Sequence, residues 1–165
     1  MRRLQTLILA LLLTAGLAPA GATTVAIAIR HHSEQEQAPV LAETVEQGAM
    51  EFLFGAGHIV FDQTIDPEDE LFHIRSILFA EAGGAEFSFV LELEFHTPSG
   101  RGLEPREVTV IVFDVENEQE AGRSTVRAGE LDGYSELDAL AIAERLGAEA
   151  ARLALTHLPG GSSEW

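Results

Sequence analysis

The segment Phe87–His96 constrains the fold more than any other part of this chain. Large apolar side chains occupy every second position, and mostly polar side chains occupy the positions between them. A period of two predicts a β-strand with one face on the core and the other mostly in water, which favours antiparallel pairing. The apolar face comprises Phe87, Phe89, Leu91, Leu93 and Phe95, and the other face comprises Ser88, Val90, Glu92, Glu94 and His96.

The pattern around this strand alternates short apolar runs with stretches of helical spacing. Two strand–helix pairs precede it, and two strands and a long helix follow it. We therefore predict one α/β domain with a mixed β-sheet in the order β-α-β-α-β-β-β-α, with helices packed on the sheet. The first three strands can run parallel through right-handed crossovers, and the last strands form a meander. The other expected strands are 25–29, 58–62, 108–116 and 123–128, and the expected helices are 39–54, 67–82 and 135–157.

The expected ends and faces of the helices follow from capping residues and periodicity. Asp66 is the expected N-cap of the second helix, with Pro67 at its first position, and Ser135 is the expected N-cap of the last helix. The second helix is expected to bury an apolar stripe on the sheet. That stripe comprises Leu71, Ile74, Ile77, Leu78 and Ala82.

Residues 1–22 have the pattern of a secretory signal peptide. Arg2 and Arg3 precede a short apolar run, and small residues follow that allow cleavage after Ala20 or Ala22. The apolar run is shorter than the roughly 20 residues that span a bilayer. We therefore expect an exported, periplasmic protein with no membrane span after cleavage, a domain over 23–158 and a disordered tail over 159–165.

The charge and composition exclude several classes of function. The 165 residues include 27 Asp and Glu but only 10 basic residues, all of them Arg, which gives a net charge of −17. Nucleic acids and anionic membranes attract clustered Lys and Arg, so neither is an expected partner. Without cysteine the chain has no disulfide, thiolate ligand or lipid-carrying thiol. An acidic surface suits a partner protein with a basic patch.

The motifs of common enzymes and cofactor sites are missing from the sequence. Gly55-Ala56-Gly57 follows a predicted helix and precedes a strand, the reverse of the order that a dinucleotide site needs. Glu70 and His73 have the spacing found in di-iron bundles, but only one such pair is present, so we interpret His73 as a partly buried helix residue. We predict no cofactor and no catalytic motif.

Arg30-His31-His32 is the best candidate for a small ligand. It lies at the carboxyl end of the first strand, where open α/β sheets bind ligands. Adjacent strand residues point to opposite faces, so His31 and His32 do not both reach one pocket if the strand continues through them. A second candidate, for contact with a partner protein, is the pair Arg101 and Arg106 in the glycine-rich loop 97–106.

Four local patterns of the sequence together resemble those of a known group of proteins. A helix leads into a short strand over 50–60, and the motif Gly-Ala-acid-aromatic begins a strand within 82–90. A valine-rich strand ends in acidic residues within 108–122, and a helix rich in Ala and Leu covers 135–157. This arrangement resembles the α/β domain shared by CsgG-like curli-secretion lipoproteins, LpoB-like activators of penicillin-binding proteins, flagellar outer-membrane proteins and the amino-terminal domain of TolB.

The resemblance implies an envelope protein that binds other proteins without catalysis, and it transfers no functional residues. The lipid anchor of several members is absent because the chain lacks cysteine. The loop 97–106 and the turn 117–122 are too short to add spanning strands, which need about 9–11 residues each. A pore like that of the curli member is therefore not expected.

These observations lead to a main hypothesis and two alternatives. The main hypothesis is a non-catalytic exported protein that acts as a protein-binding or assembly module in the bacterial cell envelope. One alternative is a periplasmic small-molecule or metal-binding protein, or an enzyme, that uses His31 and His32. The other is self-assembly through an exposed strand, against which the short, charged fifth strand argues.

Overall fold

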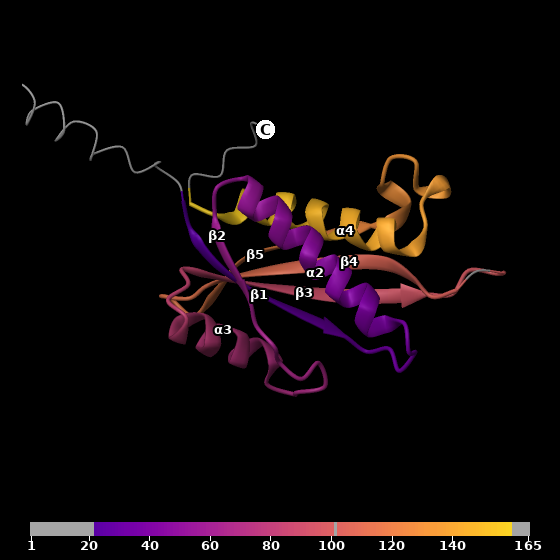
Figure 1. Cartoon of the computed structure of the whole chain (residues 1–165). Coiled ribbons are helices and arrows are strands. Elements are labelled where there is room, and N and C mark those ends of the chain that lie inside the picture. The colour runs from indigo at the N-terminus through magenta and orange to yellow at the C-terminus, as the bar shows by residue number, and fades with distance from the viewer. Residues whose placement is uncertain (1–21, 101, 160–165) are drawn as a thin grey trace, which may run out of the picture.

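The computed structural model describes residues 22–100 and 102–159, and these residues form one α/β domain around a five-stranded sheet (Figure 1). The strands follow the spatial order β2-β1-β3-β4-β5. The predicted signal peptide, apart from Ala22, and all but the first residue of the predicted tail lie outside the described residues. The strands are β1 Thr24–His31, β2 Ile59–Asp62, β3 Phe87–His96, β4 Glu104–Asp114 and β5 Gln119–Arg127.

The pairing of the strands confirms the predicted mixed sheet. β1 lies between β2 and β3 and runs parallel to both, whereas β3, β4 and β5 form an antiparallel meander. The element order β-α-β-α-β-β-β-α is therefore confirmed. Three α-helices of the described residues pack on this sheet, and none of them is long and apolar enough to cross a bilayer. The α-helices are α2 Ala38–Gly55, α3 Phe72–Ala82 and α4 Ala139–Ala154.

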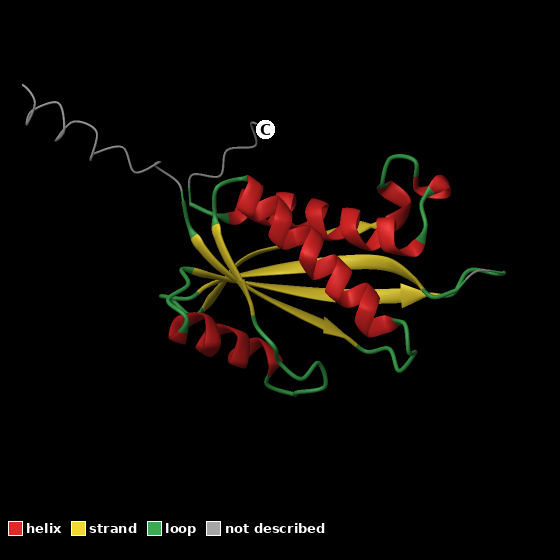
Figure 2. Ribbon diagram, viewed as in Figure 1, coloured by secondary structure: helices red, strands yellow, loops and turns green. Residues whose placement is uncertain are grey.

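Helices α2 and α4 cover one face of the sheet, and α3 lies on the other face (Figure 2). The α2/α4 face holds the larger core, in which residues of the strands meet the inner sides of both helices. Burying such side chains stabilises the fold by about 1.5–3 kcal/mol each. Fully buried members of this core include Ile27, Leu53, Phe89, Ile142 and Leu146.

Two glycines allow α2 and α4 to approach each other closely. A Cβ atom on Gly48 would overlap the carbonyl oxygen of Glu144, and one on Gly147 would overlap the carbonyl oxygen of Val45. Both obstacles are backbone atoms, which cannot rotate away as side chains do. The two helices therefore meet backbone to backbone at this point, and each of the two positions requires glycine.

The start and the buried face of α3 differ from the prediction. The helix begins at Phe72 because Asp66 and Asp69 use their side chains to cap turns before it. Asp66 Oδ1 accepts the backbone N–H of Glu68 at 3.0 Å, and Asp69 Oδ1 accepts that of Leu71 at 2.8 Å. The expected buried stripe was wrong for Leu71, Ile74, Leu78 and Ala82, which are exposed, whereas Ile77 packs against the core as a partly buried residue. The fully buried residues are Phe72, Ser76 and Ala80.

Strand β3 is buried on both faces over its first half, which corrects the expectation of one mostly wet face. Ser88 and Val90 are completely buried because α3 and the segment before it cover this part of the sheet. Glu92 is half-buried under His73 in the first turn of α3, and Glu94, two residues further along the strand, is exposed. The polar half of this face therefore begins under the first turn of α3.

Other boundaries moved for local reasons. β4 begins at Glu104, within the segment expected to be a loop, and β5 begins at Gln119. The last helix begins at Ala139 because Asp138, rather than Ser135, caps it: Asp138 Oδ1 accepts the N–H of Ala141 at 2.8 Å. Ser135 lies in a separate one-turn helix. The one-turn 3-10 helices are Ala128–Glu130, Tyr134–Glu136 and Leu155–His157.

Candidate functional site

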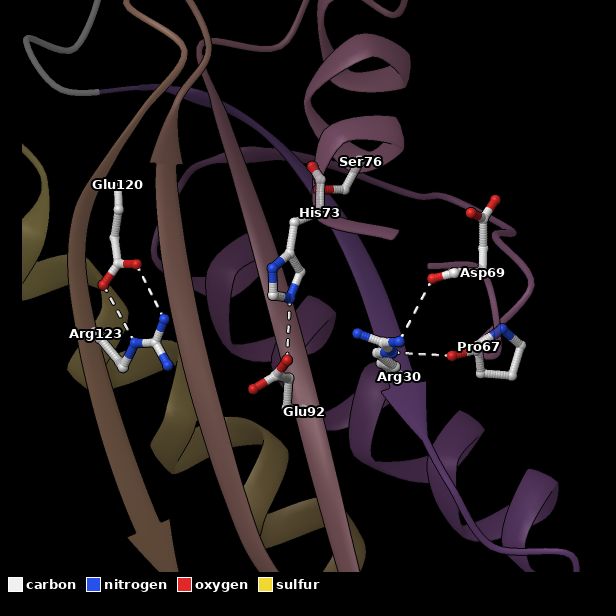
Figure 3. A network of polar contacts seen from close by, with 8 residues as sticks. All are labelled: Arg30, Pro67, Asp69, His73, Ser76, Glu92, Glu120 and Arg123. Carbon is white, nitrogen blue, oxygen red and sulfur yellow. Dashed lines mark hydrogen bonds and ion pairs between the residues drawn. The ribbon is translucent and has the colours of Figure 1, made fainter. Parts of the chain in front are cut away.

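Arg30 lies within β1 and holds the loop between β2 and α3 (Figure 3). Its Nε donates to the carbonyl oxygen of Pro67 at 2.9 Å, and its Nη2 donates to that of Asp69 at 3.4 Å. The guanidinium also lies 5.4 Å from the centre of the Phe72 ring, in the range of a cation–π contact. Its donors are thus directed at the protein's own backbone.

His31 and His32 differ in their burial. His31 is the last residue of β1 and is half-buried on the α2/α4 side of the sheet, with its ring centroid 6.0 Å from that of Phe95 in an edge-to-face arrangement. Its Nδ1 is buried without a hydrogen-bond partner among the described residues. Burial lowers the pKa of His31, and the nearby His32 lowers it further. His32 follows the strand and is exposed.

Arg106 lies in strand β4 rather than beside a loop, which corrects the expected position. Glu107 pairs with Glu94 and Pro105 pairs with Phe95, so Arg106 is the extra residue of a β-bulge. Its side chain is exposed. Arg101, the other arginine of this candidate contact, lies outside the described residues.

A buried glutamate next to this bulge was missed in the sequence. Glu104 is only 4 % exposed, and it accepts a hydrogen bond from the Tyr134 hydroxyl at 3.3 Å. His96 Nε2 lies 3.9 Å from the same carboxylate oxygen. These contacts connect the first residue of β4 to the one-turn helix before α4. No local pattern in the sequence distinguishes Glu104 from the many exposed acids.

Polar side chains form a cross-strand row on the α3 face. Arg30, Glu92, Thr109 and Thr125 are successive partners in the registers of β1, β3, β4 and β5. The Thr109 and Thr125 hydroxyls are 2.9 Å apart. The alternation in 87–96 placed Glu92 on this face, but the row depends on strand register, which a single sequence does not give.

His73 of α3 points down to this row (Figure 3). Its Nε2 lies 3.0 Å from Glu92 Oε1, and both side chains are about one-third exposed. Glu70, its neighbour in the expected Glu-x-x-His spacing, is exposed. The interpretation of His73 as a partly buried helix residue is therefore confirmed.

A second ion pair lies on the edge strand β5, on the same face of the sheet. Arg123 donates from Nε and Nη2 to the two carboxylate oxygens of Glu120, at 3.2 and 3.0 Å (Figure 3). This hydrogen bond lowers the pKa of Glu120 and raises that of Arg123. Arg30, Glu92 and the Arg123–Glu120 pair are thus each engaged by other groups of the chain.

The described residues contain no group of three or more His, Asp or Glu arranged to hold a metal ion. Two open hollows lie elsewhere on the surface. One of about 580 Å³ lies between β5 and α4, lined by Thr125, Asp132 and Arg145 among others. The other, of about 630 Å³, lies at the start of β3 and is lined by acidic side chains that include Glu81, Glu86 and Asp114.

Helix α3 turns large apolar side chains to the surface. Leu71 is 52 % exposed, Ile74 55 % and Leu78 52 %, and their spacing places all three on one side of the helix. We call these three residues the outer stripe of α3. They belong to the stripe that the sequence predicted to be buried. The helical spacing of these residues was visible in the sequence, but the sequence did not indicate whether they face the sheet or the solvent.

Comparison with known proteins supports the fold and supplies no function. No protein-family model and no curated protein sequence matches the chain. Among solved structures, the chain is similar to the PelC dodecamer from Paraburkholderia phytofirmans, with 19 % identity, a TM-score of 0.52, and coverage of 82 % of this chain and 89 % of that chain. It is also similar to lipoprotein GNA1162 from Neisseria meningitidis, with 10 % identity, a TM-score of 0.51, and coverage of 81 % and 99 %.

Weaker likenesses extend to two proteins of the group named in the sequence analysis. TolB from Acinetobacter baumannii has a TM-score of 0.48 at 15 % identity, covering 88 % of this chain and 30 % of that chain. The LpoB C-terminal domain from Salmonella enterica has a TM-score of 0.42 at 13 % identity, covering 67 % and 87 %. The resemblance is confirmed as a likeness of fold, carried by the PelC and GNA1162 structures.

Proposed function

We propose that this chain is an exported, non-catalytic protein of the bacterial cell envelope, and that it works by binding another envelope protein. The outer stripe of α3 is the observation that carries this proposal. Leu71, Ile74 and Leu78 are each about half exposed, although the chain has a net charge of −17. Contiguous apolar side chains with a polar rim are typical of protein-binding surfaces.

The polar candidates support binding of a protein over binding of a small ligand. Arg30 bonds to backbone carbonyls, His73 pairs with Glu92, and Arg123 pairs with Glu120. His31 packs against Phe95 and His32 is exposed after the end of β1, and neither belongs to a cluster of the described residues that could hold a metal ion. A binding site for a small molecule normally needs several polar groups that converge in a concave pocket.

The fold and the leader support the cellular setting. The chain shares its fold with a protein described as a dodecamer and with one described as a lipoprotein. The signal-peptide pattern of residues 1–22 supports export to the periplasm. Fold alone does not determine function, so the setting and the binding role both need a direct test.

The test is in-cell cross-linking of the tagged full-length protein, followed by purification and mass spectrometry. An unrelated exported protein with the same tag serves as the control. We expect one envelope protein to be enriched with this chain and not with the control. Recovery of the unprocessed protein from the cytoplasm would contradict the proposal, as would the absence of any specific partner. Cross-links only to further copies of the chain would support self-assembly instead.

A further inference from the structure

The contacts of α3 fix which side of the helix faces water. Phe72 lies under the Arg30 guanidinium, His73 pairs with Glu92, and Ser76 and Ala80 are completely buried against the sheet. A rotation that buried the outer stripe would break each of these contacts. It would also place a leucine or isoleucine where only serine and alanine fit. The outward direction of the stripe is therefore set by the packing of the domain.

The surroundings of the stripe are strongly acidic. Segment 66–86 carries six carboxylates and one arginine. That arginine, Arg75, forms an ion pair with Asp69, so its charge is already compensated. Glu68, Glu70 and Glu81 are exposed beside the helix, with no ion pair among the described residues. The stripe is an apolar ridge with a negative rim.

The negative charge of this rim indicates which kind of partner can bind the outer stripe. A second copy of the chain, docked stripe to stripe, would bring two negative rims together, which like-charge repulsion opposes. Anionic lipid headgroups are repelled for the same reason. A partner that buries apolar side chains and carries cations beside them satisfies both features. A helix in the partner provides such a surface because apolar residues at three- and four-residue spacing form one face.

We propose that the outer stripe of α3 docks an amphipathic helix of a partner protein, with leucine-like side chains on Leu71, Ile74 and Leu78 and with Lys or Arg against Glu68, Glu70 and Glu81. This inference rests on the proposed function, since it names the surface and the chemistry of the partner. It differs from the ligand site expected at Arg30, His31 and His32, and from the contact expected at Arg101 and Arg106.

The first part of the test locates the contact. A photo-reactive side chain is placed at Ile74 in the full-length protein and, as a matched control, at Leu140, which is 50 % exposed on α4 at the other face. Cells of the native host are irradiated, and the cross-linked peptides are sequenced by mass spectrometry. We expect cross-links from Ile74, and none from Leu140, to a partner segment with helical apolar spacing and with Lys or Arg beside it.

The second part measures the contribution of the stripe. The cross-linked segment is synthesised as a labelled peptide and titrated with the full chain and with the variant Leu71→Gln/Ile74→Gln/Leu78→Gln. Loss of several central apolar contacts weakens binding at least about 30-fold. Raising the salt from about 50 to about 300 mM weakens binding further, because the rim charges are screened. The control variant Val40→Gln/Leu140→Gln, on the opposite face, keeps the original affinity.

The outcomes separate this inference from the proposed function. A partner that cross-links from Leu140 but not from Ile74, or that binds the stripe variant unchanged, overturns the inference and leaves the proposed function standing. A cross-linked segment without Lys or Arg, a second copy of the chain, or lipid at Ile74 also overturns it. The absence of any partner from every position overturns both.

Discussion

The two faces of the sheet use helices in opposite ways. On one face, α2 and α4 bury their apolar sides and touch each other backbone to backbone at Gly48 and Gly147. On the other face, α3 buries Phe72, Ser76 and Ala80 and exposes Leu71, Ile74 and Leu78. Helices α2 and α4 expose large apolar residues near their ends, at Val40, Phe54 and Leu140, whereas α3 exposes them at helical spacing along one side. This exposed side distinguishes α3 from the two helices of the other face.

The largest effect is expected where the two-helix face is tightest. Gly147→Ala places a Cβ against the carbonyl oxygen of Val45, so the helices must separate and lose contacts along their length. We expect the free energy of unfolding to fall by about 3 kcal/mol. Urea denaturation measures this. The control is Gly55→Ala, where a Cβ would meet nothing within 4 Å. If Gly147→Ala lowered the free energy of unfolding no more than Gly55→Ala does, the helices would not be in close contact.

A smaller effect is expected from Arg30, which anchors α3 to its face. Arg30→Ala removes two hydrogen bonds to backbone carbonyls and the contact with the Phe72 ring. We expect a loss of about 2 kcal/mol, together with faster amide hydrogen exchange in α3. The control is Arg106→Ala, an exposed bulge residue whose loss changes stability by less than about 0.5 kcal/mol. Unchanged exchange in α3 would contradict the anchoring role.

Helix α2 also carries a partly buried carboxyl, that of Glu46, whose effect on stability depends on pH. Burial raises the pKa of Glu46 on α2 to about 7, with Asp62 and Glu43 adding to the rise. The charged form is thus disfavoured in the folded state, so stability falls as the pH rises from about 4.5 towards 7. Glu46→Gln removes this fall.

The measurement is denaturation of the two proteins at pH 5 and pH 8. After discounting for partial solvent screening, we expect Glu46→Gln to gain about 1–2 kcal/mol over the original protein at pH 8 and little at pH 5. The exposed Glu36→Gln serves as the control and is expected to change neither value. An equal gain at both pH values would show that the charge of Glu46 is not the cause.

The smallest effect on stability is expected from the outer stripe. Leu71→Gln/Ile74→Gln/Leu78→Gln keeps the helix propensity and leaves the buried side of α3 unchanged. We expect the free energy of unfolding to change by less than about 1 kcal/mol in total. Thermal or urea denaturation of the isolated chain measures this. A loss of several kcal/mol would mean that the stripe belongs to the core, and the contrast between the two faces would disappear.

The order of elements could be predicted because it depends on local periodicity. The alternation in 87–96 and the helical spacing of 39–54 are each visible without any knowledge of neighbours. The rotation of α3 could not be predicted, because both of its sides are apolar. Phe72 and Ala80 lie on one side, and Ile74 and Leu78 on the other, so the choice depends on contacts with Arg30 and Glu92 from distant strands.

The candidate site shows the same division. The position of Arg30 and His31 at the carboxyl end of β1 was predictable from the local pattern, whereas the pairing of His73 with Glu92 was not. Ends of elements were misplaced where a side chain competed with the backbone for a hydrogen bond, as at Asp66 and Asp138. Arg106 was expected beside a loop because its bulge depends on the register of two strands.

The close contact between α2 and α4 also determines when the chain can fold. The two helices come from near opposite ends of the domain, yet each supplies the surface that the other needs. Until the last helix has been synthesised, the inner side of α2 has no cover and the larger core cannot close. Non-local contacts of this kind delay folding because a long loop must first be ordered. Closure of the larger core is therefore a late, non-local step in the folding of this domain.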